Sequence, residues 1–134
     1  MDYKTTFTYI WIAIGVITFF YLLFFNTAPY GRHSSKKWGP TISNKFGWVL
    51  MESPALLFFL YFSLKGNPIF SNPVSVFIGL WCIHYFYRSF IFPFRIKTDG
   101  KTIPLIIALS AIAFNSVNTW LIGSFINENA LSNS

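Results

Sequence analysis

The sequence predicts an all-α integral membrane protein, a bundle of four transmembrane helices. Its 134 residues are 54% hydrophobic and only 10% charged, whereas a soluble domain carries about 25% charged residues. The apolar residues gather in four long runs, and most Lys and Arg residues lie between those runs. A lipid bilayer is the solvent that suits such a chain, so we expect a single membrane domain over residues 1–134.

The first predicted span covers about residues 7–25, a run without a charged side chain. Crossing about 30 Å of hydrocarbon takes about 20 residues at 1.5 Å each, so this run is long enough. The residues after it form a poor signal-peptidase site, which favours a retained helix. Residues 27–46 contain Gly, Pro and four Lys or Arg residues, and we expect a loop there.

Three further spans are predicted at about residues 47–64, 74–92 and 103–126. Pro93 is expected to end the third span, because proline lacks the N–H that an α-helix needs. Residues 93–102 are expected to form a short basic loop, in which Asp99-Gly100 is a strong turn signal. The polar residues after the fourth span are expected to form a tail.

The basic residues predict the orientation of the bundle. The loop at 27–46 has four Lys or Arg residues and the loop at 93–102 has three, whereas the loop between the second and third spans has only Lys65. Positive loops stay on the cytoplasmic side. We therefore expect both basic loops in the cytoplasm and both termini on the opposite side of a bacterial inner membrane or the endoplasmic reticulum.

The composition argues against several functions. The net charge of +6 arises from short clusters between apolar runs, and no nucleic-acid motif accompanies it, so contact with anionic head groups or an anionic cofactor fits better. The single cysteine, Cys82, lies in an apolar run and offers neither a disulfide nor metal-ligand spacing. We expect no metal site, and no Gly-rich phosphate loop is present.

Glu52 is an ionisable residue inside the second predicted span. At bilayer depth such a group costs at least about 2.5 kcal/mol on insertion scales, so it marks a candidate functional site. Pro54 lies two residues further on and should distort the helix beside the acid. The alternative is that Glu52 lies near the membrane surface, because it comes early in the span.

The third span carries His84, Tyr85 and Arg88. At about 100° per residue, His84 and Arg88 lie one turn apart on one face, and Tyr85 neighbours Arg88. Taken singly, the arginine could extend to the head groups and the tyrosine could join an interfacial aromatic belt. Taken with Glu52, the three residues favour a shared polar pocket between the second and third spans.

The fourth span is unusually polar. Asn115, Ser116, Asn118 and Thr119 crowd its middle. Such side chains commonly hydrogen-bond between transmembrane helices, and that is the simplest interpretation here.

Several separated segments resemble one known family, the steroid 5-alpha-reductases. The family pattern runs P-Y-G-R-H, then E-x-P, then H-Y-x-x-R, then G-(K/R)-x-x-P, then a polar helix with an Asn. The matching segments are Pro29-Tyr30-Gly31-Arg32-His33, Glu52-Ser53-Pro54, His84-Tyr85-Phe86-Tyr87-Arg88, Gly100-Lys101-Thr102-Ile103-Pro104 and Asn115 through Asn118. They cover most of the chain, in order and with compatible spacing.

The resemblance implies a seven-helix enzyme that reduces the C4–C5 double bond of 3-oxo-Δ4 steroids with NADPH. By resemblance, Glu52 and Tyr85 are the catalytic residues that hold the substrate ketone, and Trp48 helps to bind the substrate. Arg88, Lys101 and Asn118 are assigned to the cofactor. A phenol and a carboxylic acid are groups that can donate hydrogen bonds to developing negative charge.

This sequence departs from the family in its length. Family members are about twice as long, and their last three helices carry most of the NADPH contacts. We therefore expect the chain to be a substrate-binding N-terminal half that lacks the NADPH-binding half and is inactive alone. It could be a fragment, a truncated frame, or one piece of a split enzyme whose partner is a separate C-terminal half.

Two other classes of function remain open at this point. A small four-helix proton-coupled exporter also has one embedded acid among aromatic residues, although there the acid lies in the first helix. A membrane subunit without chemistry is the second alternative. Within the reductases, the substrate could be another enone, a polyprenol or an enoyl thioester.

Overall fold

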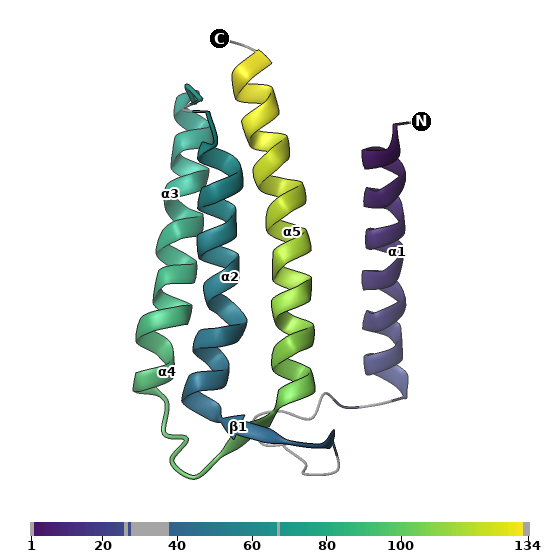
Figure 1. Cartoon of the computed structure of the whole chain (residues 1–134), viewed down its shortest axis with the longest axis vertical. Coiled ribbons are helices and arrows are strands. Elements are labelled where there is room, and N and C mark those ends of the chain that lie inside the picture. The colour runs from purple at the N-terminus through teal and green to yellow at the C-terminus, as the bar shows by residue number, and fades with distance from the viewer. Residues whose placement is uncertain (1, 26, 28–37, 67, 133–134) are drawn as a thin grey trace.

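A computed structural model of the chain describes residues 2–25, 27, 38–66 and 68–132. The motif at residues 29–33 lies outside these described residues. The long helices of the described part are α1 (Tyr3–Phe24), α2 (Asn44–Leu64), α3 (Asn72–Phe86) and α5 (Leu105–Ser132). Their axes are roughly aligned, and the start of α1 lies at the same end of the bundle as the end of α5 (Figure 1).

Four stretches of the described residues are long and apolar enough to cross a membrane. They are Tyr3–Phe24, Asn44–Leu64, Pro73–Arg95 and Leu105–Ala130. Much of their apolar surface points outward: Phe19, Leu80 and Phe125, for example, are each at least 60% exposed. Lipid is the solvent that such a surface needs. The predicted all-α membrane class with four spans is thereby confirmed for the described part of the chain.

The third span does not end at Pro93 as predicted. A π-helical turn, η3 (Tyr87–Ile91), follows α3 directly, and a short helix, α4 (Phe92–Arg95), continues to the end of the span. The N–H of Phe92 bonds to the carbonyl of Tyr87, five residues back, which is the π pattern. Proline is tolerated in the first turn of a helix, and Pro93 lies in the first turn of α4.

Two short strands were not predicted: the first lies in the expected loop at 27–46, and the second joins the end of the loop at 93–102 to the expected start of the fourth span. Strands β1 (Thr41–Ser43) and β2 (Thr102–Pro104) pair antiparallel, with Ile42 opposite Ile103. β1 leads directly into α2 and β2 leads directly into α5, so the pairing holds the starts of these helices together. We call this part of the bundle the strand end. The predicted Asp-Gly turn precedes β2, with Gly100 at φ 74°.

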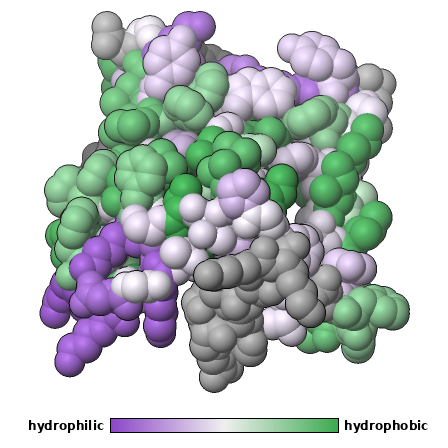
Figure 2. All heavy atoms as spheres, turned by 60° about the horizontal axis from the view of Figure 1, so that its bottom comes forward, coloured by the Kyte–Doolittle hydropathy of each residue, from purple (hydrophilic) through white to green (hydrophobic). Residues whose placement is uncertain are grey.

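The strand end differs in polarity from the flanks of the bundle. Figure 2 brings this end forward and shows hydrophilic side chains gathered there, with hydrophobic ones along the sides. Arg95, Lys97 and Lys101 are exposed in this region, and the Lys45 ammonium lies 3.1 Å from the Asp99 carboxylate. This is the charge distribution expected where membrane spans reach the head groups.

Helices α2 and α5 pack closely along their length. A Cβ added at Gly123 would lie 2.8 Å from the Phe62 Cβ and 3.2 Å from the Ser63 backbone nitrogen, so only glycine fits there. The Asn127 amide donates to the carbonyls of Ser63 and Lys65 at 3.0 and 2.7 Å and so satisfies the end of α2. Helix α5 therefore extends through residues that were predicted to be a polar tail.

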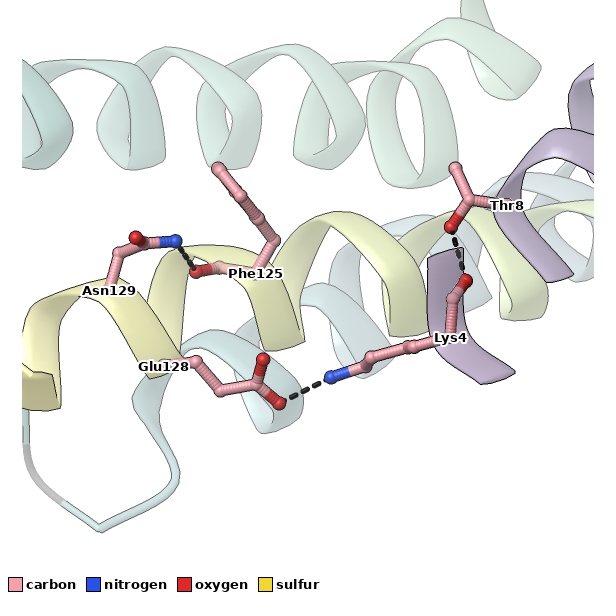
Figure 3. A network of polar contacts seen from close by, with 5 residues as sticks. All are labelled: Lys4, Thr8, Phe125, Glu128 and Asn129. Carbon is pink, nitrogen blue, oxygen red and sulfur yellow. Dashed lines mark hydrogen bonds and ion pairs between the residues drawn. The ribbon is translucent and has the colours of Figure 1, made fainter. Parts of the chain in front are cut away.

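Helix α1 lies beside α5 and touches it through side-chain tips. Trp11 Nε1 donates to Asn118 Oδ1 at 2.8 Å, and the Phe7 and Trp120 rings meet edge to face at 5.5 Å. Nearer the chain termini, the Lys4 ammonium pairs with the Glu128 carboxylate (Figure 3). None of the described residues of α1 is buried.

Candidate functional site

The predicted acid of α2 and the predicted base of the third span meet inside the bundle. Arg88 Nε and Nη2 both donate to Glu52 Oε1, at 3.2 and 2.5 Å. The Glu52 side chain is 12% exposed and the Arg88 side chain 35%. A buried carboxylate needs a partner, so this ion pair explains how the acid is tolerated at this depth.

Two aromatic rings form a corner around the Arg88 guanidinium. Its carbon lies 4.9 Å from the centroid of the Trp48 ring and 5.7 Å from that of the Phe92 ring. The two rings meet edge to face at 5.3 Å, with an interplanar angle of 79°. Both contacts are within the range of cation–π attraction, which favours a guanidinium over other cations.

Helical spacing explains how this corner is built. Trp48 lies four residues before Glu52 on α2, and Phe92 lies four residues after Arg88 on the third span. Residues four apart share a helix face, so each helix offers one charged group and one ring to the other. The sequence interpretation missed Phe92, although this four-residue spacing was the signal that could have found it.

Tyr85 lies on the same side of the third span. Its ring contacts the Trp81 ring at 4.8 Å and the His84 ring at 5.0 Å. The phenol lies within electrostatic range of both the Glu52 carboxylate and the Arg88 guanidinium. The structure therefore gathers Trp48, Glu52, Tyr85 and Arg88 in one region, and their roles toward a ligand remain predictions.

The segment of α2 that carries Glu52 is held by hydrogen bonds from both neighbouring helices. The Asn115 amide of α5 donates to the Met51 carbonyl at 2.6 Å, and Trp81 Nε1 of α3 donates to the Ala55 carbonyl at 2.9 Å. Pro54 lies between these two carbonyls and is buried. These bonds tie the backbone on either side of the proline to its neighbours and fix the position of the acid.

The other two residues that were assigned to the cofactor lie elsewhere. Asn118 is turned toward α1, where it accepts the Trp11 hydrogen bond. Lys101 is exposed at the strand end, beside a groove that Lys45, Thr98 and Asp99 also line. At 1.5 Å per residue, Asn118 lies about 20 Å along α5 from the strand end, so the two residues do not form one compact site.

Arg88 also borders an open groove on the outer face of the third span. The groove is lined by Leu80, Ile83, His84, Tyr87, Arg88 and Phe92. His84, which the sequence placed on one face with Arg88, is exposed here. The groove therefore gives access to Arg88, whereas Glu52 and Tyr85 do not line it.

Comparisons with known proteins place the chain. No protein-family model matches it. Steroid 5-alpha-reductase DET2 of Gossypium hirsutum is 34% identical over 131 residues, which make up 93% of this chain and 50% of that protein. The protein of the same name from Arabidopsis thaliana is 37% identical over 114 residues, 80% of this chain and 43% of the relative. The chain belongs to the steroid 5-alpha-reductase family.

Animal members of the steroid 5-alpha-reductase family are also similar. The 3-oxo-5-alpha-steroid 4-dehydrogenase 1 of Macaca fascicularis is 30% identical over 101 residues, 74% of this chain and 38% of that protein. The chain thus spans about half the length, or less, of the curated relatives that it matches. The family membership confirms the resemblance seen in the motifs.

Proposed function

We propose that the chain is the N-terminal, substrate-binding half of a membrane reductase that acts on the C4–C5 double bond of 3-oxo-Δ4 steroids or similar enones. The observation that carries the proposal is the cluster of Glu52, Arg88 and Tyr85 between α2 and the third span, at the positions of the family motifs. The relatives' names, steroid 5-alpha-reductase and 3-oxo-5-alpha-steroid 4-dehydrogenase, indicate the substrate class.

The proposed chemistry needs hydrogen-bond donors at the ketone oxygen. Addition of a hydride at the β-carbon of an enone moves the electrons of the C4–C5 double bond toward that oxygen, which becomes an enolate. The Tyr85 hydroxyl donates one hydrogen bond to it, and Glu52, which is a carboxylate in the ligand-free ion pair, is proposed to take up a proton together with the ligand and to supply the second hydrogen bond. Such donors act most strongly where water is scarce, as it is between membrane helices.

Trp48 is proposed to bind the apolar body of the substrate. Its ring stands beside Arg88 and Phe92 and one helical turn from Glu52, so it borders the place where the ketone would lie. A steroid is a flat apolar ligand, and aromatic walls with a few polar groups are typical of sites for such ligands.

NADPH is the cofactor that family resemblance implies, and when bound it would supply the hydride. The described residues do not form a complete nucleotide site, because Arg88 is bound to Glu52 and Asn118 to Trp11. Among the three assigned residues, Lys101 is the one whose side chain has no partner within the described part. We therefore propose that this chain binds the substrate and that most cofactor contacts come from a C-terminal half.

The orientation in the membrane is also proposed. The basic strand end, with the loop at 93–102 and the loop at 27–46, would face the cytoplasm, and the Lys4–Glu128 end would face the opposite side. Anionic lipid head groups would meet the exposed lysines there. A cysteine placed at the exposed position of Lys97 should react with a membrane-impermeant thiol reagent only from the cytoplasmic side.

A binding experiment tests the proposed function. The full chain in lipid nanodiscs is titrated with a 3-oxo-Δ4 steroid and with its 3-deoxy counterpart, which lacks the ketone. The chain should prefer the ketone, and Glu52→Leu and Tyr85→Phe, which each remove a donor, should each reduce that preference about tenfold or more, which is the worth of a hydrogen bond to a charged or polarised group. Tyr61→Phe is the matched control, since Tyr61 is 59% exposed on α2.

Variants at the same positions test the alternatives. Equal affinity for both ligands in the wild-type chain would contradict the proposed function. Loss of cation-drug resistance in cells on Glu52→Gln would favour a proton-coupled exporter. Variants that alter only folding would favour a membrane subunit without chemistry. Turnover of a 3-oxo-Δ4 steroid with NADPH, when the chain is co-expressed with a C-terminal half, would support a split reductase.

A further inference from the structure

We infer that Arg88 is a positioning residue that determines which oxygen of Glu52 meets the substrate ketone. The inference rests on the proposed function, and it gives Arg88 a role different from the cofactor contact predicted from the sequence. It is carried by the hydrogen bonds of the ion pair, by the aromatic corner around the guanidinium, and by the way in which the third span presents Arg88.

Both hydrogen bonds from the guanidinium end on one oxygen. Nε and Nη2 donate to Glu52 Oε1, whereas Oε2 accepts no hydrogen bond from the described residues. Because Oε1 already receives two N–H donors, a proton that the carboxylate takes up with the ligand would be carried by Oε2. Oε2 is then the atom that can donate to the ketone, and Arg88 makes that choice.

The guanidinium is itself held in place. Trp48 and Phe92 lie at 4.9 and 5.7 Å and meet at 79°, so the rings restrict the guanidinium on two sides. Each ring lies one helical turn from a member of the ion pair. Four side chains, two from each helix, thereby hold α2 and the third span together. A carboxyl held at a fixed angle needs no reorganisation when a ligand binds, which is the basis of preorganised binding.

The π-helical turn contributes to this arrangement. Arg88 lies inside η3, and Phe92 is the residue whose N–H closes the turn onto Tyr87. A π turn inserts one extra residue into the helix and so rotates the residues that follow it relative to those before. Tyr85 before the turn and Phe92 after it can then both border the α2 side of the third span.

The variant Arg88→Lys distinguishes the positioning role of Arg88 from the effect of its positive charge. Lysine keeps the positive charge, but it has one compact donor head and cannot offer two parallel N–H groups while lying flat against a ring. If Arg88 acts only as a counter-charge, Arg88→Lys should preserve function. If it orients Glu52, the variant should lose the preference for the ketone while it keeps the apolar part of the binding.

The central experiment measures dissociation constants of the full chain in nanodiscs for the 3-oxo-Δ4 steroid and the 3-deoxy steroid. In Arg88→Lys the ratio of the two constants should fall about tenfold, as is expected for Glu52→Leu, while the constant for the 3-deoxy steroid changes less than about twofold. Arg95→Lys is the matched control, because Arg95 is exposed at the end of α4.

A double variant tests whether Arg88 acts through Glu52. Adding Arg88→Lys to Glu52→Leu should not reduce the ratio further, because the group that Arg88 orients is already gone. Additive losses would overturn the positioning role and indicate direct contact with the ligand. An unchanged ratio in Arg88→Lys would overturn the inference but leave the proposed function intact, whereas a wild-type chain without ketone preference would defeat the proposed function itself.

An NMR measurement monitors the contact between Arg88 and Glu52 without any ligand. With arginine labelled by ¹⁵N, the Nε–H signal of Arg88, assigned by its loss in Arg88→Lys, should shift on Glu52→Gln and on Trp48→Leu but not on Tyr61→Phe. No response to Glu52→Gln would overturn the inference. If Arg88→Lys does not fold, Phe92→Leu keeps the charge and loosens the corner, and it should reduce the ketone ratio about threefold.

Discussion

Helix α5 packs against α2 and α1 through different kinds of contact. Toward α2 it presents Gly123 and the amides of Asn115 and Asn127, which reach backbone atoms of the partner helix. Toward α1 it presents Asn118 and Trp120, which meet only side-chain tips. Without a hydrophobic drive between helices in lipid, close backbone approach and interhelical hydrogen bonds determine which pairs are tight.

The difference places the candidate site on the rigid side of the bundle. Glu52 lies on α2, whose backbone is bonded to both α5 and α3, whereas α1 has no buried residue in the described part. A site that orients a ketone needs a fixed frame, and the α2–α5 pair supplies one. Among the described residues, no hydrogen bond or ion pair links α1 to Glu52 or Arg88.

The largest effect should come from breaking the ion pair of the rigid side. Arg88→Met leaves the Glu52 carboxylate at 12% exposure without its partner, which should destabilise the fold by about 3 kcal/mol. Reversible unfolding in mixed detergent micelles measures this loss. Arg95→Met is the control and should change stability by less than about 0.5 kcal/mol; equal losses would show that the pair is not buried in the bilayer.

A pair of glycine variants compares the two interfaces directly. Gly123→Ala places a Cβ against the Phe62 Cβ and the Ser63 backbone, and this overpacking should cost about 2 kcal/mol. Gly15→Ala in α1 meets nothing within 4 Å, so the variant should be neutral or gain up to about 1 kcal/mol of helix propensity. Similar losses in both variants would mean that α1 is packed as tightly as α2.

Two asparagines of α5 sharpen the comparison further. Asn115→Ala removes the hydrogen bond to the Met51 carbonyl, and Asn118→Ala removes the one to Trp11. Interhelical hydrogen bonds in membranes average about 0.6 kcal/mol, with a maximum near about 1.7. We expect about 1 kcal/mol for Asn115→Ala and about half of that for Asn118→Ala, because only the first is shared with a fixed backbone.

How much of this could be read from the sequence depends on the range of the interactions. The spans followed from apolar runs, and Glu52 and Arg88 stood out because ionisable groups in lipid need a reason to be there. Strands β1 and β2 are three residues each, so no local pattern marks them, and they form because α2 and α5 begin side by side. The helical extension through Asn127 likewise depends on a contact with α2.

The site shows the same division. The motif spacing identified Glu52, Tyr85 and Arg88 as neighbours, but the interpretation assigned Arg88 to a cofactor and did not name Phe92 or Trp81. Spacing places Phe92 on the face of Arg88, whereas the partners of Arg88, Phe92 and Trp81 depend on which residues of α2 lie opposite them. Periodicity predicts a face of a helix, whereas the partner on that face comes from the tertiary structure.

The smallest effect should come from the ion pair that links α1 to α5 near the termini. Glu128 is 61% exposed, so the Lys4–Glu128 pair is open to solvent and salt, and such pairs contribute about 0–1 kcal/mol. Lys4→Met should therefore barely change the stability of the bundle, yet it should widen the distance between spin labels placed on Thr5 and Asn129. The widening should also appear in the wild-type chain at high salt, because salt screens exposed charges. A loss as large as that of Arg88→Met would instead make α1 an integral part of the frame around Glu52.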